Sequence, residues 1–379
     1  MTAGTGHRRA AEAIAQAIQV QHPQAQVECL DVLDYAPAWF RSGYSRSYLF
    51  LVRHASWVWE ISYHLLDMDM MFRLVQPLRR AWNLFMTRRF VQRLKIHPPD
   101  LIVTTHFLPA DVCRAGKRAG WLRSPAVIVV TDLHPHWFWI APECEAMVVG
   151  TPESARVCIQ RGVFAERVQV LGIPIGQSFG QPSNRAAAVQ ALQLHPERLT
   201  VLVTSGGTTV GRFAEVVESL LALEVAHKNR LQLLVVCGED EATRRHLAGR
   251  ANTAAMPMRV FGFINTMAEL MAASDLIVAK AGGLTVSEAL GLCRPLILYH
   301  IIPGQERMNA QYVAQHGAGI IARNPQAVAH VVQQLLDAPE RLAAMGQAAQ
   351  ALSHPRAAEA IVSTVLTPLL ATAIARASA

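Results

Sequence analysis

Short apolar runs, rich in β-branched residues, recur along the chain and alternate with helical patterns. Those of the first half are 101–104, 126–131, 146–149 and 168–171, and those of the second half are 199–204, 231–237, 258–261, 275–279 and 295–299. Such runs are typical of strands that helices cover on both faces of a parallel sheet. The sequence therefore predicts an α/β chain with two sheets. We also expect Arg8–Gln21 to form a helix and Gln26–Leu30 a strand.

A polar stretch rich in Gly, Pro and Ser, residues 176–184, separates the two sets of strands. It is the best linker candidate in a chain of 379 residues, which is long enough for two domains. We predict an N-terminal domain over residues 1–178, a C-terminal domain over 179–353 and a C-terminal helix over 354–379 that returns to the first domain. Ligands of open α/β sheets bind at the carboxyl ends of the strands, so we expect the domains to face each other across a cleft.

The segment Lys280–Asn309 carries the most specific functional signal. Its Gly282-Gly283 turn follows a predicted strand and leads into a helix, whose N-terminal N–H groups suit a diphosphate. Glu288 follows one turn into this helix, where its carboxylate can accept hydrogen bonds from a ribose diol. The next strand ends in a polar loop over residues 303–309, whose carboxylate and amides suit sugar hydroxyls. Diphosphate, ribose and sugar contacts together indicate a nucleotide-sugar site.

Further candidate donor contacts come from two other strand ends and from a lysine. Ser205, Gly206 and Gly207, followed by Thr208, come after the first strand of the second half, where backbone N–H groups can meet a diphosphate. The alternative is a simple turn between a strand and a helix. Phe263 either flanks a nucleotide base or belongs to the core. Lys280 either offsets diphosphate charge or is solvated.

A glycine-rich loop opens the chain, with Gly4, Thr5 and Gly6 before His7 and a predicted helix. A helix N-terminus disfavours the imidazolium form, which leaves His7 as a neutral imidazole suited to act as a general base. Capping of the helix by a surface histidine is the alternative, and spacing does not separate the two. Loops of this kind normally follow a strand, and none precedes this one in the sequence. Either the natural start lies upstream or the first strand is lost, and the residues leave both possibilities open.

The loop Thr131–Trp137 follows the strongest strand of the first half. We expect Asp132 to orient or assist the base, and His134, His136 and Trp137 to line the acceptor side of the cleft, because the loop lies at a strand's carboxyl end. The alternative is an ordinary loop with Asp132 as a cap. His134 and His136 alone are too few ligands for a metal site.

Residues 41–94 depart from the α/β pattern. Tryptophans such as Trp57 and Trp82 occur here among many Arg, Tyr, Phe and Met residues, which is typical of amphipathic helices at a membrane interface. The net charge is +7 and the mean hydropathy is +0.21, which favours an anionic membrane surface as partner. A helical insertion with solvated arginines is the alternative. Nucleic acid is disfavoured, because the basic residues are mixed with tryptophans and no nucleic-acid motif is present.

Two further features bear on the compartment. No stretch reaches the roughly 18 apolar residues of a spanning helix. The six cysteines show neither C-x-x-C pairs nor zinc spacing, which fits a reducing compartment. We expect a cytoplasmic protein that is peripheral on the inner face of the plasma membrane.

Four segments resemble, in order, the lipid glycosyltransferases related to monogalactosyldiacylglycerol synthase and processive diacylglycerol glucosyltransferase. They are GTGHRRAAEAI, TDLHPHWFW, GIPI with a following Phe, and Lys280–Asn309. The resemblance spans nearly the whole chain and is most specific in the last third. It implies a GT-B fold of two Rossmann-like domains and an inverting transfer from UDP-glucose or UDP-galactose to diacylglycerol or a related lipid.

The resemblance also assigns roles to residues. It implies that the uracil lies by Phe263 and Ile264, that Glu288 binds the ribose, and that His7 or Asp132 is the base. The diphosphate would be held by Gly282, Gly283, Leu284 and Thr285. The sugar would be read by Gln305, Glu306 and Asn309. No cofactor and no metal are required by this scheme. The membrane-facing segment of the family falls at Arg41–Leu94.

Two other enzyme classes stay open. The N-acetylglucosaminyltransferases that act on lipid-linked precursors share the Gly-Gly-Leu-Thr-x-x-Glu pattern but match less well in the loop 303–306. Sugar-nucleotide epimerases have a similar two-domain layout, but a soluble substrate needs no aromatic and basic surface. A third possibility is a non-catalytic lipid-binding protein. Release of free UDP separates a transferase from an epimerase.

Overall fold

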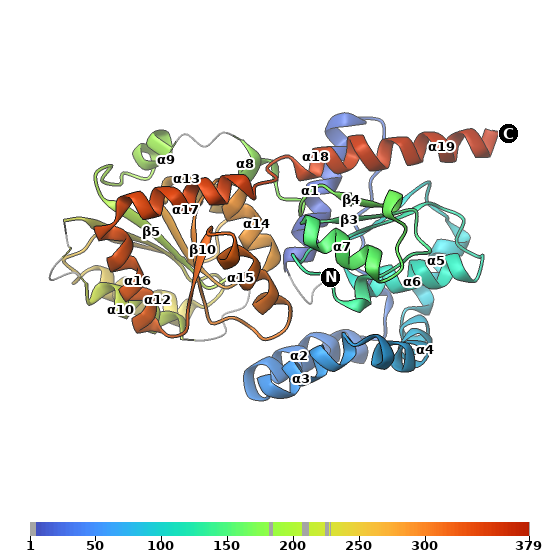
Figure 1. The fold of residues 1–379 in the computed structure, drawn as a ribbon, viewed down its shortest axis with the longest axis horizontal. Coiled ribbons are helices and arrows are strands. Elements are labelled where there is room, and N and C mark those ends of the chain that lie inside the picture. Colours follow the sequence, from blue (N-terminus) through green and yellow to red (C-terminus); the bar gives the residue numbers. More distant parts are fainter. Residues whose placement is uncertain (1–4, 182–184, 207–211, 224–226, 228, 379) are drawn as a thin grey trace. The chain divides into compact units, whose positions relative to one another are not determined.

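The computed structural model describes residues 5–181, 185–206, 212–223, 227 and 229–378 (Figure 1). The chain forms two compact units. The first comprises Met1–Gly176, Pro303–Gln305 and Arg356–Ala379, and the second comprises Gln177–Ile302 and Glu306–Pro355. Each unit is built around one parallel sheet.

The sheet of the first unit has the strand order β1-β2-β3-β4 and is parallel throughout. Its strands are β1 (Ile102–Thr104), β2 (Ala126–Val129), β3 (Ala146–Val149) and β4 (Val168–Val170). Alternate residues of β2 face opposite sides, as a strand's period of two requires. Ile128 packs in the core shared with α6 (Phe107–Arg118) and α7 (Pro152–Gln160). Val127 packs in the core beneath α1 (Thr5–Gln21).

The C-terminal residues pack on the same face as α1 (Figure 1). They form α18 (Ala357–Ile361), a π-helical turn η4 (Val362–Leu366) and α19 (Thr367–Ser378). Val362 and Leu366 are buried against α1. His22 Nε2 lies 2.7 Å from Thr367 Oγ1. The helix that carries His7 is therefore anchored by residues from the far end of the chain.

The aromatic and basic segment is entirely helical. It comprises α2 (Ala38–His54), α3 (Ser56–Leu66), α4 (Asp69–Met86) and α5 (Arg88–Ile96), preceded by the 3-10 turn η1 (Val32–Tyr35). The expectation of amphipathic helices is confirmed. The predicted strand at Gln26–Leu30 is wrong, because this segment has no strand partner among the described residues and all five of its side chains are exposed.

The second unit contains a six-stranded parallel sheet of order β10-β9-β8-β5-β6-β7. Five of its strands were predicted: β5 (Leu199–Thr204), β6 (Leu231–Val236), β7 (Met258–Phe261), β8 (Leu276–Ala279) and β9 (Leu296–Tyr299). The edge strand β10 (Gly319–Ala322) was not, because it is short and begins at a glycine. The helices are α8 (Gln177–Gly180), α9 (Arg185–Ala191), α10 (Phe213–Leu221), α12 (Glu241–Ala251), α13 (Met267–Ala273), α14 (Gly283–Gly291), α15 (Gln305–Gln315), α16 (Pro325–Asp337) and α17 (Pro339–Ala351).

Candidate active site

His7 lies in the first turn of α1, beside the carboxyl ends of β1 and β2. Its Nδ1 is 2.9 Å from the carbonyl oxygen of Thr105 and 2.7 Å from Oγ1 of Thr131. The Thr105 hydroxyl in turn donates to the carbonyl oxygen of His7 (2.8 Å). Two strand ends thus fix the position and the ring orientation of one imidazole.

His7 is held in its neutral form. Burial lowers its pKa to about 4. A second imidazole, that of the buried His106, packs edge-on at 4.6 Å, and burial together with His7 lowers the pKa of His106 as well. Because the Thr105 carbonyl only accepts, its contact with Nδ1 requires a proton on Nδ1. The other ring nitrogen, Nε2, then carries the lone pair and can act as a base.

Asp132 directly follows Thr131, which contacts His7, and its side chain is half-buried. Its negative charge also reaches Tyr63 of α3, where it contributes, after burial, to raising the pKa of the phenol. His7, Asp132 and Tyr63 therefore gather at the carboxyl end of the first unit's sheet. The sequence identified His7 and Asp132 as candidate bases, and the structure brings both to one place.

The residues expected on the acceptor side make extensive contacts within the protein. His136 is buried, its Nδ1 accepts from the Phe138 N–H (3.1 Å), and its Nε2 lies 3.1 Å from the Tyr63 carbonyl oxygen. Burial lowers the pKa of His136 to about 4 and lowers that of His134 as well. Trp137 stacks on Phe72 at 5.0 Å.

An ion pair completes this attachment of α3 and α4 to the loop. Arg161 donates two hydrogen bonds to Asp67, at 2.9 and 3.0 Å, and a third to the Pro135 carbonyl oxygen. Asp67 also accepts from the Trp137 N–H (2.9 Å). The contacts of His136 and Trp137 thus fasten the helical segment to the sheet, and their role toward an acceptor stays a prediction.

The second unit has a topological switch point between β5 and β8. From β5 the chain continues to β6 and β7 on one side, whereas β8, β9 and β10 lie on the other. Ligands of doubly wound sheets bind at the carboxyl end of such a point. The residues that follow β5 and β8 there are Ser205, Gly206, Lys280 and Gly282. Sequence reasoning selected all four, and the sheet order brings them together.

The geometry at the switch point depends on glycine. Gly206 has φ +71°, and a Cβ at this position would lie 3.3 Å from Cε of Lys280. The Lys280 side chain is 7% exposed and passes directly over this turn. Burial and the nearby Lys280 ammonium also lower the pKa of His300, which follows β9. A buried cation at the carboxyl edge of the sheet suits an anionic ligand.

Helix α14 begins at Gly283, with Gly282 as its N-cap. Among the described residues no side chain caps this end, and a Cβ at Gly282 would meet nothing within 4 Å. The first N–H groups of α14 thus border open space, as an anion site at a helix N-terminus requires. Leu284 and Glu288 are buried along α14, and Thr285 is half-buried.

The predicted sugar-reading residues lie in the first turns of α15. Glu306 accepts from the Ile302 N–H (3.0 Å), and Asn309 donates to the Ala281 carbonyl oxygen (3.0 Å). Asn309 thereby braces the loop between β8 and α14. Oε1 of Gln305 is buried without a hydrogen-bond partner in the described part of the chain. The sugar contacts of these residues stay predictions.

The structure describes some of the remaining predicted positions and not others. Phe263 follows β7 and is 70% exposed, which excludes the core alternative, and Ile264 is half-buried beside it. Gly6 lies in the first turn of α1, ahead of His7. Gly4, Gly207 and Thr208 lie outside the described residues. Thr105 and His106 were missed, although a Thr-His pair directly after the strand β1 was the available signal.

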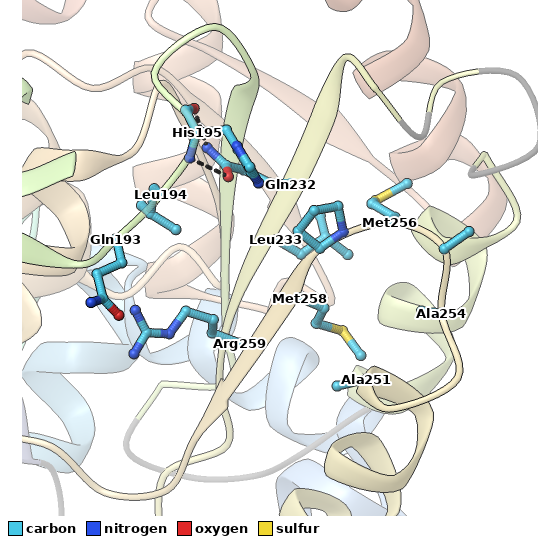
Figure 2. Close-up of a pocket in the computed structure, with 12 residues that line it drawn as sticks. Gln193, Leu194, His195, Gln232, Leu233, Ala251, Ala254, Met256, Met258 and Arg259 are labelled. Atoms are coloured by element: carbon cyan, nitrogen blue, oxygen red, sulfur yellow. Dashed lines mark hydrogen bonds between the residues drawn. The ribbon is translucent and has the colours of Figure 1, made fainter. Parts of the chain in front are cut away.

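A separate concavity lies at the opposite, amino-terminal edge of the second sheet (Figure 2). Its volume is about 360 Å³, and its lining includes His195, Gln232, Met258 and Arg259. The polar atoms of Gln232 and the His195 backbone bond to each other, at 3.1 and 2.8 Å. None of the predicted site residues lines it, so we place the candidate site at the carboxyl edge. Within the described ranges, no three His, Cys, Asp or Glu side chains are grouped to hold a metal ion.

Two family models match the chain. The model described as monogalactosyldiacylglycerol (MGDG) synthase matches residues 7–175, and the glycosyltransferase family 28 C-terminal domain matches residues 200–361. Among curated relatives, a processive diacylglycerol beta-glucosyltransferase of Bacillus cereus is 32% identical over 283 residues, which is 74% of this chain and 71% of that protein. A Bacillus anthracis protein of the same name matches equally.

Solved structures show the same fold at lower identity. Acinetobacter baumannii MurG covers 75% of this chain and 78% of its own, with 19% identity and a TM-score of 0.56. The S. aureus MnaA–UDP co-structure covers 77% and 81%, with 15% identity and a TM-score of 0.57.

The two parallel sheets and these likenesses define a GT-B glycosyltransferase fold, as predicted. The chain belongs to the diacylglycerol glycosyltransferase family that the MGDG synthases and the processive diacylglycerol glucosyltransferases represent, which confirms the resemblance seen in the sequence. It is accordingly a hexosyltransferase of glycolipid synthesis.

Proposed function

We propose that this enzyme transfers a hexose from UDP-glucose or UDP-galactose to diacylglycerol or a related lipid at a membrane surface, with inversion at the anomeric carbon. The observation that carries the donor assignment is the switch point of the second sheet. Buried Lys280, the turn at Gly206 and the uncapped N-terminus of α14 converge there on one place that suits a diphosphate. The relatives' names support the lipid acceptor.

The proposed reaction is a single displacement. The lipid hydroxyl loses its proton to His7 Nε2 or to Asp132, and its oxygen attacks the anomeric carbon from the face opposite UDP. The bond between that carbon and the diphosphate oxygen breaks, and UDP leaves with the bonding electron pair. Lys280 and the N–H groups of α14 stabilise the charge that develops on the diphosphate. The low pKa of His7 keeps its base form populated at neutral pH.

The membrane assignment rests on the unusual orientation of α4. Its exposed face is apolar, with Met70, Leu74 and Leu78 at spacings of four residues and 70–76% exposed. Its inner face carries polar residues beside the buried Phe72 and Met86: Gln76 and Asn83 each donate to the buried Asp111 at 2.9 Å. Arg79 forms an ion pair with the same carboxylate. A helix that exposes an apolar stripe of this kind fits a bilayer interface.

Neighbouring elements extend this surface. On α3, Trp57, Ile61 and Leu65 are exposed at the same four-residue spacing. Arg88 and Arg89 of α5 are exposed next to Phe85, and Arg88 lies over the Phe85 ring at 5.2 Å. Cationic side chains beside apolar ones favour an anionic lipid surface. No helix in the described part of the chain is both long and apolar enough to span a bilayer.

Release of UDP in mixed micelles tests the proposed reaction. UDP-glucose, UDP-galactose and UDP-N-acetylglucosamine are each supplied with and without diacylglycerol. We expect lipid-dependent release of UDP from either UDP-glucose or UDP-galactose. His7→Ala should lower the rate of this release about 10²-fold or more. Release that does not depend on lipid, or that occurs only with UDP-N-acetylglucosamine, contradicts the proposal.

Flotation with vesicles tests the surface. We expect the chain to float with vesicles that contain anionic lipid, and the triple variant Met70→Ser, Leu74→Ser, Leu78→Ser to float much less. Those side chains are exposed, so their replacement should leave the melting temperature unchanged. A chain that floats with neither anionic nor neutral vesicles has no such surface.

A further inference from the structure

Tyr63 carries a buried hydroxyl that has no hydrogen-bond partner in the part of the chain that the structure describes. A buried polar group without a partner costs about 1–3 kcal/mol, so native proteins rarely keep one that has no use. Phenylalanine would fill the same space without this cost, since only the hydroxyl distinguishes the two side chains.

The position of Tyr63 on α3 links the outer surface to the site. Trp57, Ile61 and Leu65 form the exposed stripe of this helix. Tyr63 is two residues from both Ile61 and Leu65, a rotation of about 200° on a helix, so it points to the opposite, inner face. There its ring packs on His136 at 4.6 Å. One helix thus presents an apolar stripe outward and a single phenol inward.

The charges around the phenol keep it a donor. Burial, Asp132 and Asp67 raise the pKa of Tyr63, which Arg161 offsets in part. The hydroxyl therefore stays protonated at any working pH and can donate a hydrogen bond to an acceptor oxygen. Asp132, one of the two candidate bases, is close enough to act on Tyr63 electrostatically. A group of the acceptor that is hydrogen-bonded to Tyr63 would therefore lie near the acceptor's reacting hydroxyl.

We propose that the Tyr63 hydroxyl donates a hydrogen bond to an ester carbonyl oxygen of the lipid acceptor, which makes α3 the element that recognises the acyl-glycerol end of the substrate. The assignment rests on the proposed function. An ester carbonyl accepts and does not donate, which matches a phenol held in its protonated form. Since the Tyr63 oxygen is covered in this structure, binding of the acceptor includes displacement of the groups that cover it.

The test compares two acceptors and two enzymes. The acceptors are a diacylglycerol and the dialkyl ether of the same chain lengths, which lacks the carbonyl oxygens. The variant is Tyr63→Phe, and Tyr35→Phe is its control, because Tyr35 packs on Phe90 in a separate core of the same unit. Initial rates of UDP release give kcat/KM for each acceptor, and thermal unfolding gives the melting temperature.

We expect Tyr63→Phe to lower kcat/KM for the diacylglycerol roughly tenfold, the typical worth of one hydrogen bond, and to leave the ether acceptor unchanged. The KM for the UDP-sugar should stay unchanged, and the melting temperature should not fall. Tyr35→Phe should resemble the wild type in all of these measurements. Equal rates for Tyr63→Phe and wild type, or equal losses with both acceptors, would overturn the assignment. If the wild type itself shows no lipid-dependent release, the proposed function fails and the role of Tyr63 fails with it.

Discussion

The orientation of the His7 ring is fixed by two contacts, and one of them can be removed without touching the imidazole. Thr131→Val keeps the volume of the side chain but removes the oxygen 2.7 Å from Nδ1, whereas Thr131→Ser keeps that oxygen. We expect Val to lower kcat about fivefold to tenfold, because the loss of one hydrogen bond lets the ring reorient, and Ser to restore most of the rate. Steady-state UDP release checks this.

The pH profile of the wild type and the melting temperatures of the two variants separate this positioning role from a structural one. With His7 as base and its pKa at about 4, kcat/KM of the wild type should stay level from pH 8 down to about pH 5. An acid limb near pH 6.5 would mean that His7 is not held in its neutral form. If Val and Ser reduce kcat equally and lower the melting temperature together, Thr131 serves packing alone.

At the scale of residues, the sequence identified the candidate catalytic and binding side chains more readily than the residues that contact them. His7, Asp132 and Lys280 were identified from local context, namely a glycine turn or a strand end. Thr105 and His106 were missed, because their contacts with His7 join positions about a hundred residues apart. The contacts of His136 with α3 could not be foreseen for the same reason.

The N-terminus of α14 allows a clean test at the scale of one element. Gly282 has φ −65°, which alanine also adopts, and its missing Cβ faces open space. Gly282→Ala should therefore leave stability unchanged but weaken UDP binding about tenfold, because a methyl group would stand where the diphosphate approaches the N–H groups. Calorimetric titration with UDP measures the affinity.

A matched glycine provides the control. Gly249 lies inside α12, and a Cβ there also meets nothing within 4 Å. Gly249→Ala should raise stability by about 0.5–1 kcal/mol, as expected for a helix interior, and leave UDP binding alone. If Gly282→Ala binds UDP as tightly as Gly249→Ala does, the diphosphate does not lie at this helix end.

Elements buried on both faces were the most predictable from sequence. The strands β3 and β5 have the residues that the pattern predicted, because a short and continuous apolar run is typical of a strand that helices cover on both sides. The segment Gln26–Leu30, which mixes polar and apolar residues, stays exposed and unpaired within the described part of the chain, since strand formation depends on a partner that the local sequence does not specify. The order of the strands, which creates the switch point, is likewise a property of the whole sheet.

At the scale of the whole molecule, three histidines of the first unit couple its stability to pH. Burial lowers the pKa of His7 and His136 to about 4, and it lowers the pKa of His106 well below its ordinary value. In the unfolded chain these imidazoles return to an ordinary pKa of about 6.5. Between about pH 4 and pH 6.5 the unfolded state therefore binds more protons than the folded state. The free energy of unfolding must fall as the pH falls through this window.

We expect the melting temperature to be level above about pH 7 and to drop steadily from about pH 6.5 toward pH 4. By pH 4, His7 and His136 together lower the free energy of unfolding by up to about 6 kcal/mol. Thermal unfolding followed by circular dichroism at several pH values measures this. His106→Asn is the informative variant, because its amide oxygen can still accept from the Leu108 N–H as His106 Nδ1 does (3.0 Å), while it cannot take up a proton. Its melting temperature should depend less steeply on pH than that of the wild type. Equal slopes would show that His106 is not kept neutral by the fold, and a melting temperature that rises on acidification would contradict the burial of all three.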